Sequence, residues 1–496
     1  MKQFLFLLTT LLFISIHSYS QNIHFIKSYG NSGYDYGRDI KQDLDTGYIA
    51  TGSSSSFSSG TADAFLLKVD SLGNFMWSYN YGGQETDWGE SVVVTHDSSY
   101  AIGGYTNSFG AGGFDFYLVR ADNDGTPLWE RTYGGSDWDR AHSIIQLADS
   151  GFVLVGDTYS FGNGNADIYM VRTDKHGDTL WTRTYGGPEN DFGNAVILDG
   201  DSLVVVGGTE SFGNGMSDGI ILKYHINGNF GWRKVVGKER NDYFTSIVSN
   251  GLGEYFAGGT RSYYYDQTGY LGDFWMYNIS NDGNVLLADT TLSYPTHELE
   301  ITHDIIVTPN DNTIYVGETK SFGTGLIDFQ PDAYIGYMNN NYYSYNYVEV
   351  FGTKGDDILF GMDYCFDGGI VAIGTMEHSS TGGGNLIIVR VDKINSFGSI
   401  FVHNDLVYDD ITLSFERITQ PFNSFNVYPT IFDRIINFDF FPKKSIIKIY
   451  AMNGSIVYEN NNLTETQLNL SFLTSGIYIL NIETDQHSLS TKIIKN

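Results

Sequence analysis

Cysteine is almost absent from this chain of 496 residues, which carries Cys365 alone. No internal disulfide can form, so the fold has to be held together by its core. Proline is also scarce, with 8 residues, whereas glycine reaches 58 and aromatic residues make up 15%. This mixture is typical of short strands joined by tight turns. We expect Cys365 to be a buried structural thiol, because a thiol needs a nearby base to act as a nucleophile.

Basic residues are few. The chain has 28 Lys and Arg against 58 Asp and Glu, which gives a net charge of −30. Nearly all of this excess lies in residues 22–420, because residues 421–496 carry equal numbers of acids and bases. So acidic a surface repels polyphosphate, and we therefore predict that nucleic acid is not a partner.

Long apolar runs are missing except at the N-terminus. There Lys2 is followed by an apolar stretch from Phe4 to Ile16 and by the small residues Ser18 and Ser20. This pattern predicts a signal peptide over residues 1–20. No later segment reaches the ~18 apolar residues that a spanning helix needs, so we predict no transmembrane segment and a soluble, exported protein.

What the sequence does contain is a repeat of about 50 residues. A first marker occurs at Tyr29-Gly30, Tyr81-Gly82-Gly83, Tyr133-Gly134-Gly135, Tyr185-Gly186-Gly187, Val236-Gly237, Tyr294-Pro295 and Phe351-Gly352. A second marker, Ser-Phe-Gly or a variant of it, also occurs seven times, from Ser56 to His378. Each unit holds four strand-like segments with hairpin signals such as Asp124-Gly125. The predicted fold is all-β: a seven-bladed β-propeller of four-stranded blades over residues 21–415.

One strand type occurs eight times, from Phe25–Tyr29 to Ile400–Val402, whereas the other three occur seven times each. One terminal copy must therefore complete the last blade, and the sequence leaves open which one does so. A β-solenoid is the competing repeat fold, but its coils are shorter and seldom contain hairpins. The units resemble the extracellular bacterial propeller repeats that combine Tyr-Gly-Gly, Asp and Ser-Phe-Gly in each blade.

The repeat ends before a linker, residues 416–424, and a small β-sandwich domain, residues 425–496. Its motifs are Val427-Tyr428-Pro429, Lys448-Ile449-Tyr450, Asn453-Gly454, Ser475-Gly476-Ile477-Tyr478 and Lys492 to Asn496. In these motifs the domain resembles the type A C-terminal sorting domain of the bacterial type IX secretion system, although Thr430-Ile431 replaces the usual Asn-Pro. The resemblance implies that the type IX machinery is a partner. It also implies export through the periplasm and outer membrane, followed by anchoring at the cell surface or release.

The acidic residues do not indicate a catalytic pair. One acid recurs in every unit, from Asp35 to Asp357, and a catalytic pair needs two unlike environments. We interpret this column, and a second one from Asp63 to Asp332, as structural acceptors in turns. Asp122-Asn123-Asp124-Gly125 begins like a calcium loop, but Tyr133 occupies the position of the bidentate Glu, so we predict a hairpin turn. We predict no catalytic residue, no cofactor and no metal site.

Insertions in the fifth and sixth units carry the candidate ligand-binding residues. These are Tyr263, Tyr264, Tyr265, Tyr342, Tyr343 and Tyr345. Aromatic faces in loops stack well on sugars or peptides. The alternation of Tyr343, Tyr345 and Tyr347 fits a buried strand face equally, and that alternative stays open. The leading hypothesis is a monomeric binding or adhesion module for an extracellular glycan or protein. The alternatives are an extracellular polysaccharide-active enzyme and a passive surface structural protein.

Overall fold

The structure is a computed structural model in which the chain divides into two compact units, Met1–Phe415 and Glu416–Asn496. It describes residues 23–412 and 427–495, with gaps at 32, 57, 59, 267–268, 293–299, 311, 321–329, 340–343, 353–354, 379–382, 393–398, 405–408, 429–430, 433–434, 439–445, 452–455, 461–466 and 484–487. The regular elements within these ranges are all strands. No helix in the described residues is long and apolar enough to cross a membrane.

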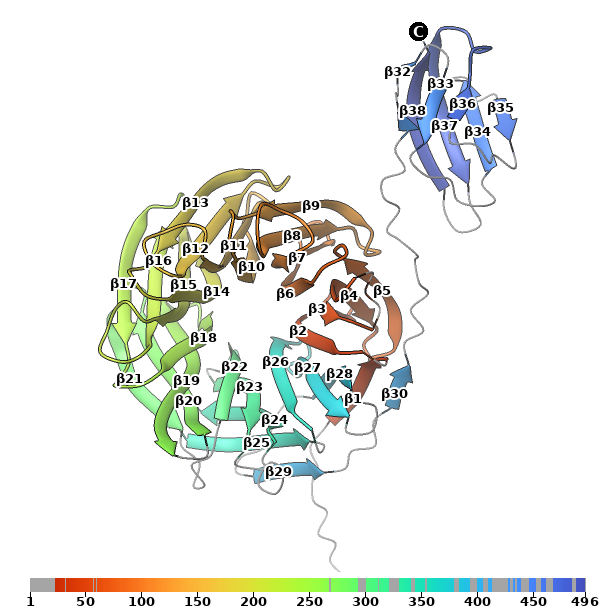
Figure 1. The fold of residues 1–496 in the computed structure, drawn as a ribbon. Coiled ribbons are helices and arrows are strands. Elements are labelled where there is room, and N and C mark those ends of the chain that lie inside the picture. Colours follow the sequence, from red (N-terminus) through yellow and green to blue (C-terminus); the bar gives the residue numbers. More distant parts are fainter. Residues whose placement is uncertain are drawn as a thin grey trace, which may run out of the picture. The chain divides into compact units, whose positions relative to one another are not determined.

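The first unit is the predicted seven-bladed propeller, with its blades arranged in a ring (Figure 1). Blade one consists of β2 (Asp35–Gln42), β3 (Tyr48–Ser54), β4 (Asp63–Val69) and β5 (Phe75–Tyr81). Blade two consists of β6 (Asp87–Val94), β7 (Tyr100–Thr106), β8 (Asp115–Ala121) and β9 (Pro127–Tyr133). Blade three consists of β10 (Asp139–Gln146), β11 (Phe152–Thr158), β12 (Asp167–Thr173) and β13 (Thr179–Tyr185). Blade four consists of β14 (Asp191–Asp199), β15 (Ser202–Thr209), β16 (Asp218–His225) and β17 (Phe230–Val236). Blade five consists of β18 (Asp242–Ser249), β19 (Glu254–Asp266), β20 (Gly269–Ser280) and β21 (Val285–Leu292). Blade six contains β22 (Glu300–Val307), β23 (Asn312–Thr319), β24 (Asp332–Asn339) and β25 (Ser344–Gly352), and blade seven contains β26 (Asp357–Tyr364), β27 (Ile370–His378) and β28 (Gly383–Val391).

The core lies between the blades. The two middle strands of a blade are almost wholly buried, as β7 and β8 are, whereas the outermost strand β9 is partly exposed. Ile49 and Leu66 of blade one pack against Ile102 and Val119 of blade two in one buried cluster. Because each blade covers the apolar face of the next, the sheets are stable only as a ring.

The N-terminal copy of the repeated strand closes the ring. This strand, β1 (Ile23–Gly30), pairs antiparallel with β28 and completes blade seven. The C-terminal copy, β29 (Ser399–Asn404), pairs parallel with β25 as a fifth strand of blade six. A further strand, β30 (Asp409–Thr412), pairs parallel with β1. The question that the sequence left open is thereby answered: the first copy closes the propeller and the last copy covers an outer edge.

The tyrosine of the first repeat marker ties neighbouring blades together. Its hydroxyl donates to a hairpin glycine carbonyl of the following blade, at 2.6 Å in each of the pairs Tyr29–Gly73, Tyr81–Gly125 and Tyr133–Gly177. These glycines have φ values of +73°, +85° and +81°, which favour glycine over other residues. Between blades three and four Arg183 takes over the role, since its Nε donates to the Gly228 carbonyl at 2.9 Å.

The second unit contains two sheets. A three-stranded sheet has the order β31 (Val427–Tyr428), β33 (Ile435–Phe438), β36 (Gln467–Asn469). A five-stranded sheet has the order β32 (Ile431–Phe432), β38 (Ser488–Lys495), β37 (Gly476–Glu483), β34 (Ile446–Ala451), β35 (Ile456–Asn460). The packing of these sheets as a sandwich stays a prediction.

Candidate functional site

A buried acid opens the innermost strand of every blade. These residues are Asp35, Asp87, Asp139, Asp191, Asp242, Glu300 and Asp357. Asp139 accepts hydrogen bonds from Gly135 N at 2.7 Å, from Ser160 Oγ at 2.7 Å and from Thr158 Oγ1. The carboxylate thus joins the Tyr-Gly-Gly turn that enters the blade to the Ser-Phe-Gly turn within it. Asp87 makes the same set of contacts, which confirms the structural role predicted for these acids.

Two further acidic features also belong to turns. In the second column, Asp167 accepts hydrogen bonds from Asn163 N at 2.7 Å and from Gly164 N at 3.1 Å. In the calcium-like fragment, Asp122 Oδ1 accepts from Asp124 N at 3.0 Å and from Thr126 N at 2.8 Å. The fragment connects β8 to β9 as a hairpin, as predicted. Within the described ranges, no group of three or more His, Cys, Asp and Glu is arranged to hold a metal ion.

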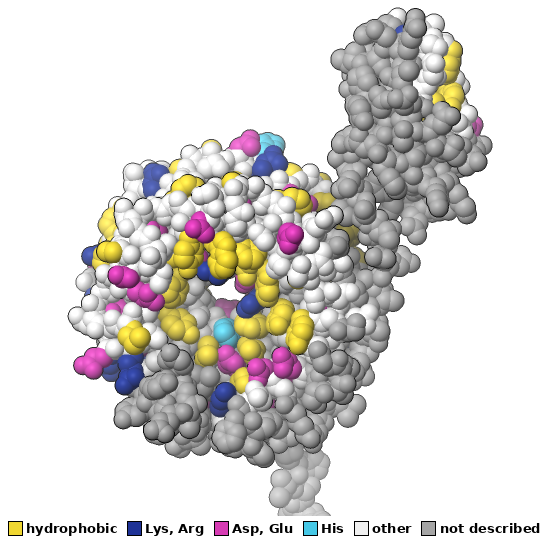
Figure 2. Space-filling model, in the orientation of Figure 1, with side chains coloured by type: hydrophobic (Ala, Val, Ile, Leu, Met, Phe, Trp, Pro, Cys, Tyr) yellow, Lys and Arg dark blue, Asp and Glu magenta, His cyan; other side chains and the backbone are white. Residues whose placement is uncertain are grey.

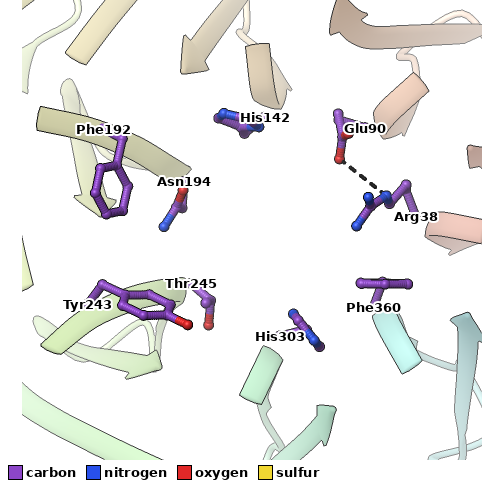
Figure 3. A pocket seen from close by; sticks show the side chains of 9 residues that line it. All are labelled: Arg38, Glu90, His142, Phe192, Asn194, Tyr243, Thr245, His303 and Phe360. Atoms are coloured by element: carbon purple, nitrogen blue, oxygen red, sulfur yellow. Dashed lines mark ion pairs between the residues drawn. The ribbon is translucent and has the colours of Figure 1, made fainter. Parts of the chain in front are cut away.

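A ring of seven side chains of six different kinds lies three residues after the acids. The antiparallel register between the first two strands shifts at this position in all seven blades, which marks a β-bulge. The extra residue of a bulge is unpaired in the ladder, so its side chain can point in a direction that the regular alternation of a strand would not give it. The seven residues are Arg38, Glu90, His142, Asn194, Thr245, His303 and Phe360. Together with Phe192 and Tyr243 they line a cavity of about 350 Å³ in the channel (Figure 3).

The cavity opens through an apolar rim. Figure 2 shows hydrophobic side chains gathered around the central opening, with charged and histidine side chains within it. Inside, Arg38 Nε lies 3.7 Å from Glu90 Oε2. The guanidinium of Arg38 also lies over two rings, 4.2 Å from the centroid of Phe360 and 5.1 Å from that of Trp88. Arg38 is therefore held by an ion pair and by cation–π contacts at once.

The two histidines of the ring each have a carboxylate nearby. His142 Nε2 lies 2.7 Å from Asp157 Oδ1, and Arg140 binds the same carboxylate at 3.0 Å. Burial raises the pKa of Asp157, but the contacts with His142 and Arg140 outweigh it and hold that pKa below the ordinary value. His303 Nε2 lies 3.6 Å from Glu318 Oε1. The cavity thus offers hydrogen-bond donors and acceptors side by side, on aromatic walls.

The thiol of Cys365 is not part of this site. Its side chain is buried in the core cluster between blades seven and one, as the sequence predicts. Burial raises its pKa to about 12, so the thiol stays protonated and is a poor nucleophile.

The tyrosines selected from the sequence are not among the described residues that line the cavity. Tyr263, Tyr264 and Tyr265 belong to β19, in the extended β19–β20 hairpin of blade five, where Tyr265 pairs with Tyr270. Tyr345 belongs to β25. Tyr342 and Tyr343 lie outside the described residues. The ring in the channel was not predicted, although aligning the seven units would have revealed one column, three residues after the acids, in which basic, acidic, polar and aromatic side chains all occur.

Comparison with known proteins gives matches of two kinds. Residues 426–496 match the family described as "Secretion system C-terminal sorting domain". Among curated proteins, the regulatory protein FlaEY of Caulobacter vibrioides is 27% identical over 178 residues, which is 31% of this chain and 18% of that protein. The chain therefore spans less than a fifth of that relative's length.

The matches among solved structures include two proteins of low sequence identity. The WD40 domain of Neurospora crassa Pan2 has a TM-score of 0.46 and 10% identity, covering 74% of this chain and 92% of that one. PorZ, a surface component of the type IX secretion system of Porphyromonas gingivalis, has a TM-score of 0.41 and 12% identity, covering 94% of this chain and 60% of that one. The assignment of the tail rests on the family match: residues 426–496 are a type IX secretion sorting domain, and the protein is exported to the cell surface or the extracellular space.

Proposed function

We propose that the propeller is a binding module that captures an extracellular glycan or protein at the mouth of its central channel. One observation carries the proposal: six kinds of side chain occupy the seven equivalent bulge positions around a cavity of about 350 Å³. A cavity of this size, with aromatic walls and a few convergent polar groups, is typical of a small-ligand site.

The contrast with the rest of the ring supports this choice of site. The turns repeat from blade to blade, as the contacts of Asp87 and Asp139 do. A repeated turn would give several equal, weak sites, whereas a specific ligand needs a surface that occurs once. Export to the cell exterior brings such a surface into contact with extracellular ligands.

The polysaccharide-active enzyme is less well supported by the cavity. Glycoside hydrolysis ordinarily uses two carboxyl groups on either side of the bond that is cleaved. Among the described residues that line the cavity, Glu90 is the single carboxylate, and Arg38 is its ion-pair partner.

The tyrosines of blades five and six remain a second proposed contact surface for the same ligand. The combined change Tyr264→Ala and Tyr342→Ala is expected to weaken binding by ~1–3 kcal/mol if these rings stack on the ligand. If the rings are core residues instead, the pair of changes lowers the melting temperature and leaves the affinity of the folded protein unchanged.

The test is a binding screen of the mature chain against arrayed glycans and extracellular proteins. His303→Ala is expected to weaken the binding of the captured ligand about tenfold, because it removes a ring wall and a polar atom from the cavity. His176→Ala is the matched control, since His176 lies exposed in the β12–β13 hairpin. Equal affinities of wild type and a folded His303→Ala variant for every ligand found would overturn the channel site.

A further inference from the structure

An unbroken strip of aromatic rings crosses blades one to three and borders the cavity residue Arg38 at Trp88. In spatial order the rings are Tyr34, Tyr36, Trp88, Tyr105, Phe114 and Trp138. Successive ring centroids are 6.1, 5.5, 6.1, 5.1 and 5.7 Å apart. At the positions equivalent to Tyr36 and Trp88, blade three holds Arg140, blades four and five hold Phe192 and Tyr243, and blades six and seven hold Ile301 and Ile358.

The two ends of the strip are open to solvent. Tyr34 is 45% exposed and Trp138 is 50% exposed, and Tyr159 beside Trp138 is 41% exposed. The rings between them are half-buried. Gly113 makes room for the last ring, because a Cβ at this position would lie 2.1 Å from Trp138 Cδ1. Large rings that are held in place and exposed at the surface are a common mark of a binding surface.

The strip and the cavity meet at Arg38. Its guanidinium lies over Trp88, a member of the strip, and over Phe360, which lines the cavity. At the Trp138 end of the strip, the guanidinium of Arg140 lies 5.9 Å from the ring centroids of both Trp138 and Tyr159. Rings and planar cations therefore form one continuous surface that leads into the cavity.

The charges along this surface are balanced in pairs. Arg38 faces Glu90, Arg140 and His142 share Asp157, and His303 faces Glu318. The chain as a whole carries a net charge of −30. A polyanion gains no net attraction here, whereas an uncharged ligand rich in hydroxyl groups can use the donors and the acceptors together. The flat apolar faces of sugar rings suit the aromatic strip.

We propose that the strip and the cavity form one extended site for an uncharged polysaccharide, whose chain end enters the cavity while the following sugar residues stack along the strip. The inference deepens the proposed function and rests on it.

The test is a length series of uncharged oligosaccharides, made from the neutral polysaccharide that the mature chain retains best on an array, with polygalacturonate as the anionic probe. Wild-type affinity is expected to rise with chain length. The double change Tyr34→Ala and Trp138→Ala should weaken binding of the longest member roughly tenfold and leave the disaccharide unchanged. His303→Ala should weaken both. Phe230→Ala, which removes a ring that is 51% exposed on β17, is the matched control.

Three results would overturn the inference. These are equal losses for short and long chains in the Tyr34 and Trp138 double variant, tighter binding of polygalacturonate than of any neutral chain, and failure of every neutral polysaccharide to bind. The proposed function has its own readout. If a protein or an anionic ligand binds and loses affinity with His303→Ala, the channel site stands while the polysaccharide assignment fails.

Discussion

At the scale of single residues, carboxylates inside the channel connect the innermost strands of adjacent blades. Asp304 Oδ1 accepts a hydrogen bond from Ser246 Oγ of blade five at 2.7 Å, and its Oδ2 accepts from Met362 N of blade seven at 3.0 Å. Asp39 likewise accepts from Ser91 Oγ and Val92 N of blade two. The channel wall is therefore held by charged groups as well as by the apolar core.

Asp304 should make the stability of the ring depend on pH. Burial raises its pKa to about 6, against the lowering effect of Lys41. Between the ordinary carboxyl pKa of about 4 and the raised value of about 6, the folded state binds a proton that the unfolded state has already released. The stabilisation from this proton is full below pH 4 and is lost as the pH rises through 6. Asp304→Asn, which stays uncharged, is expected to raise the melting temperature relative to wild type at pH 7.5 and to leave it nearly unchanged at pH 4.5.

Differential scanning calorimetry at the two pH values would measure this effect. Asp39→Asn, which removes a carboxylate that accepts a hydrogen bond from the nearby Lys41, serves as the comparison. The same difference in melting temperature between wild type and Asp304→Asn at both pH values would contradict the prediction.

At the scale of elements, the hydroxyl of Tyr29 links blade seven to blade one at the seam, which is the junction where the ring closes. It lies on β1 and donates to the Gly73 carbonyl of blade one. Tyr29→Phe removes this bond and leaves a buried carbonyl without that donor, so we expect a loss of about 0.5–1.5 kcal/mol in the free energy of unfolding. Urea denaturation would measure it. Tyr81→Phe, away from the seam, is the control; a loss of the same size there and none for Tyr29→Phe would mean that the seam does not depend on this bond.

The sequence predicted the elements better than their pairing. Seven copies of each repeat marker, exact or degraded, predicted the number of blades, because each marker is local in the chain. Closure by β1 could not be predicted, since Phe25–Tyr29 and Ile400–Val402 have similar patterns and only the partner strands tell them apart. The ring of bulge residues was not recognised from the sequence for a related reason: a bulge is defined by the register between two strands, which a single strand pattern does not reveal.

At the scale of the whole molecule, the sorting domain and the propeller carry separate tasks. The chain divides near residue 416, and all strands of the ring precede that point. Removal of residues 416–496 should therefore leave a folded propeller that stays in the periplasm, because the tail that directs export is missing. Protease accessibility on intact cells, with calorimetry on the purified fragment, would check both halves. A folded fragment displayed at the surface would contradict the role of the tail.

The two extra strands of blades six and seven also have a mechanical consequence. The chain leaves the propeller through β29 and β30, which lie on the outer edges of these blades and pair with β25 and β1. A pull that reaches the ring through the C-terminal tail acts on these two strands before any four-stranded blade. Their detachment would release residues 399–412, roughly 45–50 Å of extended chain, while β1 stays paired with β28. Under tension we expect the segment between the propeller and the C-terminal tail to lengthen in one early step before the ring opens. Single-molecule pulling would detect this step.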